Sequence, residues 1–311
     1  MRLSLAAAVS LGVLGAALSW TSNSFAYCRT TTCDEGDESC KKNERGCVSS
    51  GVLVTWGDQK TIPYRIYAGG SSKLDDDQMR DAVHQAFETW QTVDCGDGRT
   101  SLRFVEGEPI REDKPLGLTA EEAEKRGIEP FGIYFRDEKW DHSAANGDVL
   151  AATSLAYGVR KGLVSYADIE INTVEGELTF DDDQAPTAHD FQAILTHEIG
   201  HYIGLAHSKD ADSIMAPVYC SSEARCNDDG VAGKRALADD DIRAVCTLYP
   251  HGKQTLVPDQ PTDSPGLNGG TTAGCSATRG GGFGATFPAA GAGLVSLGAA
   301  FLRRRRRRPC L

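Results

Sequence analysis

The sequence predicts an α+β fold, in which a mixed, twisted sheet of five strands is backed by helices. Five short apolar segments and three longer helical patterns fill residues 61–248, in the order strand, helix, then four strands, then two helices. Because a sheet must bury its apolar face against another layer, this order implies one sheet with helices packed on it.

Five segments are strand candidates. TIPYRIY at residues 61–67 predicts the first strand, SLRFVE at 101–106 the second and FGIYF at 131–135 the third. Residues 148–157 and 164–173 predict the last two strands, which are joined by a turn near residues 158–162.

The first long helix is predicted over residues 74–93. It places apolar side chains at three- and four-residue steps, which makes one buried stripe. These residues are Met79, Val83, Ala86, Phe87 and Trp90. A shorter helix is predicted after Thr119, because Thr119 and Glu122 have the spacing of a capping box.

A second long helix is predicted to start at Asp190, a suitable N-cap residue. Its apolar stripe consists of Phe191, Ile194, Leu195 and Ile199. A loop is predicted for residues 208–234, and a final helix for 238–248, with Ile242, Val245 and Leu248 on one face.

The charge balance argues against a nucleic-acid partner. The chain of 311 residues has 32 Lys and Arg against 44 Asp and Glu, a formal net charge of −12. Nucleic acids are bound through basic patches that neutralise phosphates. The one basic block, Arg303–Arg308, lies at the extreme C-terminus.

The N-terminus has the pattern of a secretory signal. Arg2 precedes an apolar stretch over residues 3–18, and Ser24, Phe25 and Ala26 form the small-x-small site that predicts cleavage after Ala26. A membrane anchor is the alternative, although the stretch is short for a span. The chain then divides into a signal peptide, a Cys-rich segment, a main domain, a flexible linker and a C-terminal tail, at residues 1–26, 27–50, 51–251, 252–274 and 275–311.

Export changes how the ten cysteines are interpreted, since exported cysteines usually form disulfides. Eight remain when the two in the tail are set aside, so four bridges can form, in a pairing that the sequence leaves open. Residues 27–50 hold four of them, and a metal-binding knuckle is the alternative there. Their spacing lacks the tight pairs of such knuckles, which favours disulfides.

The segment HEIGHYIGLAH at residues 197–207 has the spacing of a catalytic zinc site. His197 and His201 are four residues apart on a helix, so both rings project from one face and can ligate one metal. Gly204 allows the chain to turn and bring back His207 as a third ligand. Glu198 is then the general base that takes a proton from a water on the metal.

This pattern resembles the metzincins and, within them, the matrixins, over roughly residues 52–250. The resemblance implies a metzincin-like catalytic domain with an active-site helix, a backing helix and a C-terminal helix. It implies that Met215 is the Met-turn residue beneath the zinc, and that Pro217, Val218 and Tyr219 flank the specificity pocket. Residues 148–157 correspond to the cleft-edge strand, where Ala151 and Ala152 are the expected substrate contacts.

The resemblance further implies a secreted or surface-held zinc endopeptidase with one catalytic zinc and a polypeptide substrate. Two other functions stay open. One is a non-catalytic surface binding or adhesion protein with a zinc-stabilised cleft, which would not need Glu198. The other is a peptidase restricted to cell-wall peptides, which these residues do not distinguish from general proteolysis.

Three features of the family are not evident. The usual motif of the inhibitory pro-segment is missing, and an N-terminal cysteine could replace it only at the expense of an odd count. His142 and His189 are candidates for a second zinc but lack the expected partners. Calcium is a candidate cofactor because acidic residues cluster at Asp137, Glu138, Asp141 and Asp181–Asp183.

The tail contains residues 284–302, which carry no charge, followed by the six arginines. This length can just span a bilayer, and the arginines favour a cytoplasmic end. Together with Gly274, Cys275 and Ser276, the tail is similar to three-part sorting signals of the MYXO-CTERM type. We therefore expect a monomer, extracellular or held at the cell surface through a transient membrane tail.

Overall fold

The computed structural model describes residues 26–34, 37–58, 61–115, 118–140, 149–174, 178–181, 188–217, 219–220, 231–232, 235–252 and 267–274. Residues 1–25 and 275–311 lie outside these ranges, and with them the predicted signal sequence and sorting tail. Within the described residues, no helix combines the length and the apolar character needed to cross a membrane.

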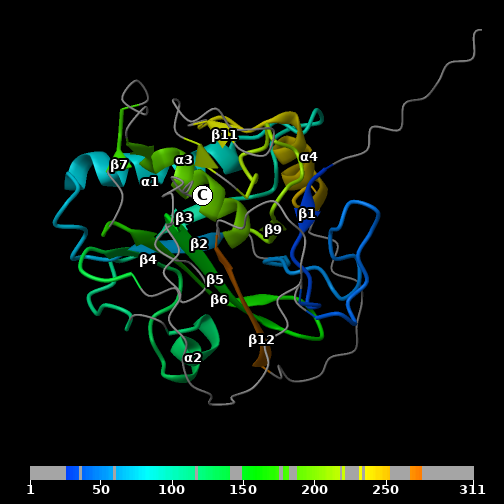
Figure 1. Cartoon of the computed structure of the whole chain (residues 1–311), viewed down its shortest axis with the longest axis horizontal. Helices are drawn as coiled ribbons and strands as arrows, with labels where there is room; N and C mark the ends of the chain where they lie inside the picture. The colour runs from blue at the N-terminus through cyan, green and yellow to red at the C-terminus, as the bar shows by residue number, and fades with distance from the viewer. Residues whose placement is uncertain are drawn as a thin grey trace, which may run out of the picture.

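The main sheet is mixed, as predicted (Figure 1). Its strand order is β12 (Leu267–Gly274), β5 (Ala151–Gly158), β6 (Val164–Asn172), β4 (Gly132–Arg136), β2 (Ile62–Ile66), β3 (Phe104–Glu106). Strands β6, β4, β2 and β3 run parallel, whereas β5 is antiparallel to β6 and β12 is antiparallel to β5. All five predicted strands are present, and β12 is a sixth.

Strand β12 lies within the residues that the sequence predicts to be a linker. It pairs with nearly all of β5, from Leu267 opposite Gly158 to Gly274 opposite Ala152. Its sequence, LNGGTTAG, has no apolar alternation that would indicate a strand. Pairing of this kind depends on main-chain groups of the exposed β5 edge, which accepts a partner strand of almost any sequence.

In the described ranges, four helices accompany the sheet: α1 (Asp76–Gln91), α2 (Ala120–Lys125), α3 (Phe191–Tyr202) and α4 (Asp239–Leu248). The N-termini of α2 and α3 follow the predicted signals. The carboxylate of Asp190 accepts the N–H of Ala193 at 2.9 Å, and Thr119 with Glu122 forms a complete capping box. The predicted stripe of α1 is buried throughout and faces the core.

The helices divide between the two faces of the sheet. Helices α1, α3 and α4 pack on one face, where the main core lies, and α3 is buried along its whole length. On the other face, α2 packs against Ala156 of β5 and Tyr166 of β6. The period of two along β6 explains the division, because alternate side chains point to opposite faces.

A buried ion network lies on the α2 face. The Nζ atom of Lys114 lies 2.6 Å from an oxygen of Asp168 and 2.7 Å from an oxygen of Glu170. The guanidinium of Arg136 joins Glu170 at 3.0 Å to the more exposed Asp113 at 2.8 Å. Buried carboxylates require such partners, because an unpaired charge inside a protein costs several kcal/mol.

Among the residues that the structure describes, three short strand pairs lie outside the main sheet. They are β1 (Cys28–Arg29) with β9 (Leu205–Ala206), β7 (Leu178–Thr179) with β8 (His189–Asp190), and β10 (Tyr219–Cys220) with β11 (Val231–Ala232). The β1–β9 pair matters for function because β9 follows α3 directly.

The prediction of disulfides is confirmed. The described bridges are Cys28–Cys47, Cys33–Cys40 and Cys95–Cys246. The first two fold residues 27–50 onto themselves, so that segment uses disulfides rather than a metal. The third joins the turn after α1 to α4 across 151 residues of sequence. Cys226, Cys275 and Cys310 lie outside the described residues.

Candidate metal centre

The site is built where α3 ends. The carbonyl of Tyr202 accepts the indole N–H of Trp56 at 2.8 Å, and the carbonyl of Ile203 accepts the hydroxyl of Tyr249 at 2.8 Å. The chain then turns at Gly204, which has a φ of 95°. A Cβ at Gly204 would lie 2.2 Å from the carbonyl oxygen of Val54, so only glycine fits this turn.

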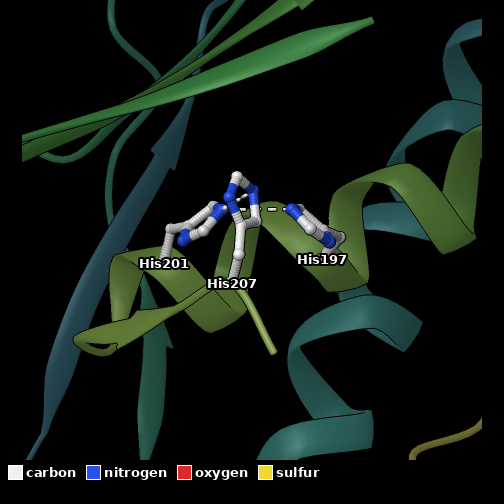
Figure 2. A group of neighbouring side chains, drawn as sticks. All are labelled: His197, His201 and His207. Carbon is white, nitrogen blue, oxygen red and sulfur yellow. Dashed lines mark hydrogen bonds between the residues drawn. The ribbon is translucent and has the colours of Figure 1, made fainter. Parts of the chain in front are cut away.

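The turn brings the three predicted histidines together (Figure 2). His197 and His201 project from one face of α3, and His207 reaches back from the loop after β9. The Nε2 atom of His201 lies 3.0 Å from that of His197 and 3.2 Å from that of His207. Within the described part of the chain, this is the one group of three or more metal-binding side chains.

The hydrogen bonds fix the tautomers of the two helical histidines. The Nδ1 atom of His197 lies 2.6 Å from the carbonyl oxygen of Ile214, and that of His201 lies 2.9 Å from the carbonyl oxygen of Leu205. A carbonyl can only accept, so both Nδ1 atoms carry the proton. Both Nε2 atoms therefore present lone pairs to the centre of the group, as a metal ligand must.

Burial keeps the histidines neutral. It lowers the pKa of His201 to about 4. Burial, followed by repulsion from the neighbouring His201, also lowers the pKa values of His197 and His207 well below their usual range. Neutral imidazole is the form that binds a metal, so these rings would not have to lose a proton to bind one at neutral pH.

The group fits zinc. Nitrogens bound tetrahedrally to one zinc at about 2.0–2.1 Å lie roughly 3.3 Å apart, close to the spacing of these Nε2 atoms. Lone pairs brought this close repel one another unless a cation lies between them. Three protein ligands also leave a fourth position for water or substrate, which distinguishes a catalytic zinc site from a structural one.

Glu198 is buried beside the histidines and is held by Thr153 of β5. The hydroxyl of Thr153 lies 2.6 Å from Oε2 of Glu198 and 3.0 Å from its main-chain oxygen. The other carboxylate oxygen, Oε1, has no hydrogen-bond partner among the described residues. Burial raises the pKa of Glu198 to about 8, and the bonds from Thr153 act in the opposite direction.

Sequence reasoning missed Thr153. A threonine in a strand is common and carries no motif. Its position could have been inferred from the strand period, since Thr153 shares a face of β5 with Ala151, an expected cleft residue.

Met215, which follows the three histidines in the sequence, lies against α3. It is buried, and its Sδ atom lies 2.1 Å from the point that a Cβ on Gly200 would occupy. Asp241 of α4 holds this turn by accepting the hydroxyl of Ser213 and, at 2.9 Å, the N–H of Ile214. The same turn supplies the carbonyl that orients His197.

Asp240, the neighbour of Asp241, holds the other side of the loop. It is fully buried and accepts the hydroxyl of Ser208 at 2.7 Å and the N–H of Ala26 at 3.0 Å. Through the first turn of α4, the paired aspartates therefore fix the loop that follows His207, at Ser208 and at the Met215 turn.

The expected substrate contacts fall on β5 and after Met215. Ala151 and Ala152 are buried in β5, and Ala152 pairs with Gly274 of β12. Pro217 is half-buried at the end of the Met215 turn. Val218 lies outside the described residues, and Tyr219 is described only through its backbone in β10.

Other metal candidates are not brought together in the described residues. His189 lies in β8, and burial lowers its pKa. Asp137 binds three hydroxyl groups, from Ser71, Ser72 and Thr173. His142, Asp141, Asp182 and Asp183 lie outside the described residues.

Comparison with known proteins points to one family. The family model described as Matrixin matches residues 55–250. Matrix metalloproteinase-C of Caenorhabditis elegans is 29% identical over 182 residues, which are 58% of this chain and 27% of that protein. Matrix metalloproteinase-16 of Homo sapiens is 26% identical over 197 residues, 61% of this chain and 26% of that protein.

Stromelysin-2 of Rattus norvegicus is 35% identical over a shorter stretch of 97 residues, 29% of this chain and 19% of that protein. The chain spans about a quarter of the length of the first two relatives. The similarity therefore concerns only a part of each relative.

Proposed function

The chain belongs to the matrixin family, and on that premise we propose that it is a zinc-dependent endopeptidase acting on polypeptides outside the cell or at its surface. The observation that carries this proposal is the grouping of three neutral imidazoles beside a buried glutamate. One oxygen of Glu198 is held by Thr153, and the other has no hydrogen-bond partner among the described residues.

His197, His201 and His207 would hold the metal. Zinc, when bound there, supplies a Lewis acid that polarises the scissile carbonyl and acidifies water. Oε1 of Glu198 accepts the proton of the attacking water, and Glu198 then donates that proton to the leaving amine. Thr153 keeps the carboxylate in one orientation throughout. The positive charge of a metal would also favour the ionised form of Glu198, which burial alone disfavours.

The substrate would lie along the outer edge of β5 as an extended strand, held by main-chain hydrogen bonds. Strand β12 of the same chain occupies that edge and ends opposite Ala152, next to Thr153. A polypeptide substrate must therefore displace β12 or enter where it ends. The edge has the capacity to pair with an extended peptide, because β12 itself does so.

The extracellular setting is supported by two features. The N-terminus has a secretory pattern, and the described domain contains three disulfides, which persist in oxidising compartments.

The test is Glu198→Ala in the full chain, compared with Glu106→Ala as a control on the surface of β3. We expect the Glu198 variant to retain stoichiometric zinc by metal analysis and to lose hydrolysis of a casein-derived peptide. The control is expected to keep both properties. Hydrolysis by the Glu198 variant at the wild-type rate, in zinc-saturated protein, would refute the proposed role of Glu198.

A further inference from the structure

His207 depends on its surroundings more than the other two histidines do. His197 and His201 are fixed by the main-chain hydrogen bonds of α3, whereas His207 follows two residues of β9 beyond the Gly204 turn. The affinity of the site for zinc therefore depends on what holds residues 204–208, since every residue that must be ordered on binding weakens it.

The N-terminal segment holds this stretch directly. In the β1–β9 pair, Cys28 lies opposite Ala206 and Arg29 opposite Leu205. The N–H of Thr30 donates to the carbonyl of Gly204 at 2.9 Å, and its hydroxyl donates to the carbonyl of Leu205 at 3.2 Å.

Leu205 links this contact to the metal centre. Its carbonyl oxygen accepts both the hydroxyl of Thr30 and the Nδ1–H of His201. The backbone position of Leu205 thus sets the orientation of His201, and the backbone of Ala206 leads directly into His207. The β1–β9 strand pair and the adjoining Thr30 therefore help to position two of the three candidate ligands, His201 and His207.

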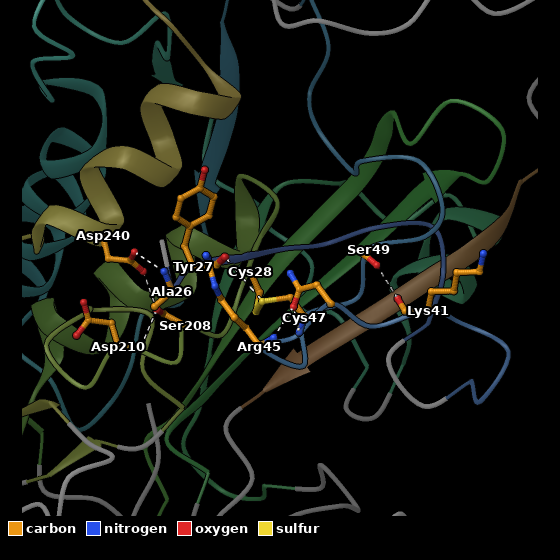
Figure 3. The surroundings of a disulfide bond; sticks show 11 residues. Ala26, Tyr27, Cys28, Lys41, Arg45, Cys47, Ser49, Ser208, Asp210 and Asp240 are labelled. Atoms are coloured by element: carbon orange, nitrogen blue, oxygen red, sulfur yellow. Dashed lines mark hydrogen bonds between the residues drawn. A yellow bond between two sulfur atoms is a disulfide. The ribbon is translucent and has the colours of Figure 1, made fainter. Parts of the chain in front are cut away.

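The segment is itself anchored at two points. The Cys28–Cys47 disulfide fastens β1 to the rest of residues 27–50 (Figure 3). On its other side, the carbonyl of Thr30 accepts the N–H of Val54 at 2.9 Å, which joins the segment to the chain that enters the core. The Cys33–Cys40 disulfide closes a separate loop of the same segment, and the residues that pair with β9 are Cys28 and Arg29 rather than either of these cysteines.

We propose that residues 27–50 are a positioning element of the metal centre, which holds the loop carrying His207 and so raises the affinity of the site for zinc. This segment precedes the residues matched by the family model, 55–250. The proposal rests on the proposed zinc site and adds that its strength depends on the Cys28–Cys47 bridge. The affinity for zinc would then depend on whether Cys28 and Cys47 are oxidised to a disulfide, although neither cysteine is a candidate ligand.

The test compares two disulfide deletions in the full chain, Cys28→Ala/Cys47→Ala and Cys33→Ala/Cys40→Ala. The zinc dissociation constant is measured by competition with a coloured chelator of known affinity. We expect the first variant to bind zinc about 10- to 100-fold more weakly than the wild type, equivalent to about 1.4–2.8 kcal/mol. The second variant is expected to bind within about threefold of the wild type.

A second pair of variants avoids the disulfides. Thr30→Val removes the hydroxyl that donates to Leu205. Thr32→Val instead removes a hydroxyl that accepts the N–H of Val52, just beyond the segment. Weaker zinc binding by the Thr30 variant alone is expected. Thermal unfolding of each metal-free protein reports whether it is folded.

The outcomes separate the two levels of the argument. A wild-type protein that binds no zinc would refute the proposed function. If the wild-type protein binds zinc and all four variants bind it with the wild-type affinity, the positioning role of residues 27–50 is refuted. Equal weakening in both disulfide variants would refute it too, because the effect would then be general destabilisation.

Discussion

Replacing Thr153 by valine tests the chemistry of the site most directly. Valine keeps the branched shape of threonine and its place in β5 but cannot donate to Glu198. The lost bond is short, at 2.6 Å, and Thr153 and Glu198 are both fully buried. A buried hydrogen bond to a charged group contributes about 1.5–3 kcal/mol.

That range predicts the change in rate. If the bond orients Glu198 in the transition state, its loss should lower kcat by about 10- to 150-fold, at about 1.4 kcal/mol for each factor of ten. KM should change little, because the hydroxyl of Thr153 is used by Glu198 rather than by the substrate. The zinc content should stay the same, since Thr153 is not a ligand.

The assay is hydrolysis of a quenched fluorescent peptide by zinc-saturated protein, with kcat and KM determined separately. Thr153→Ser is the matched control, because serine restores the hydroxyl without the methyl group, and it should recover most of kcat. The reasoning fails if the valine variant keeps kcat within about twofold of the wild type, or if serine is as poor as valine.

Four further changes test other parts of the structure. His207→Ala should lower the zinc content, and full occupancy by metal analysis would show that the third ligand is misassigned. Lys114→Met leaves two buried carboxylates of β6 without their ammonium partner. It should lower the free energy of unfolding, measured by denaturant titration, by about 3–5 kcal/mol. A loss below about 1 kcal/mol would contradict the burial of the network. Burial raises the pKa of Asp137, but the hydrogen bonds that it accepts outweigh burial and lower the pKa from 3.8 to about 2. The ionised carboxylate therefore stabilises the fold above this range, and its contribution is lost as the pH falls through it. Asp137→Asn should lower the Tm at pH 7 and match the wild type near pH 2. The double substitution Thr271→Pro/Thr272→Pro removes the main-chain N–H by which one of these two neighbours bonds to β5, and so weakens the pairing of β12. It should lower KM for a peptide substrate by about tenfold, because β12 then competes less for the edge. An unchanged KM would show that β12 does not compete for this edge.

Local sequence patterns predicted the parts of the fold that depend on local chemistry. The spacing of the three histidines, the N-cap at Asp190 and the strand segments are all properties of a few consecutive residues. Asp190 indeed starts α3. The stripe predicted for α3 was incomplete, because the helix is buried on every side and carries its polar motif inside the protein.

Other features could not be predicted because they depend on residues far apart in sequence. Lys114 lies in a polar stretch that suggests an exposed loop, yet its side chain is buried between two carboxylates that follow more than fifty residues later. Thr153 acquires its role only when β5 is placed over α3. Strand β12 forms because an edge is available, and its own composition gives no sign of it.

The Cys95–Cys246 bridge has a consequence for what proteolysis does to the chain. It closes a covalent ring around 151 residues of sequence, and this ring includes the main strands of the described sheet except β2 and β12, together with all three histidines. A single cut anywhere inside the ring leaves both pieces attached to each other. Such a nicked molecule would migrate as one species on a gel without reductant and as two with it. The Cys95–Cys246 disulfide thus keeps the two pieces in one covalent molecule after a first cut.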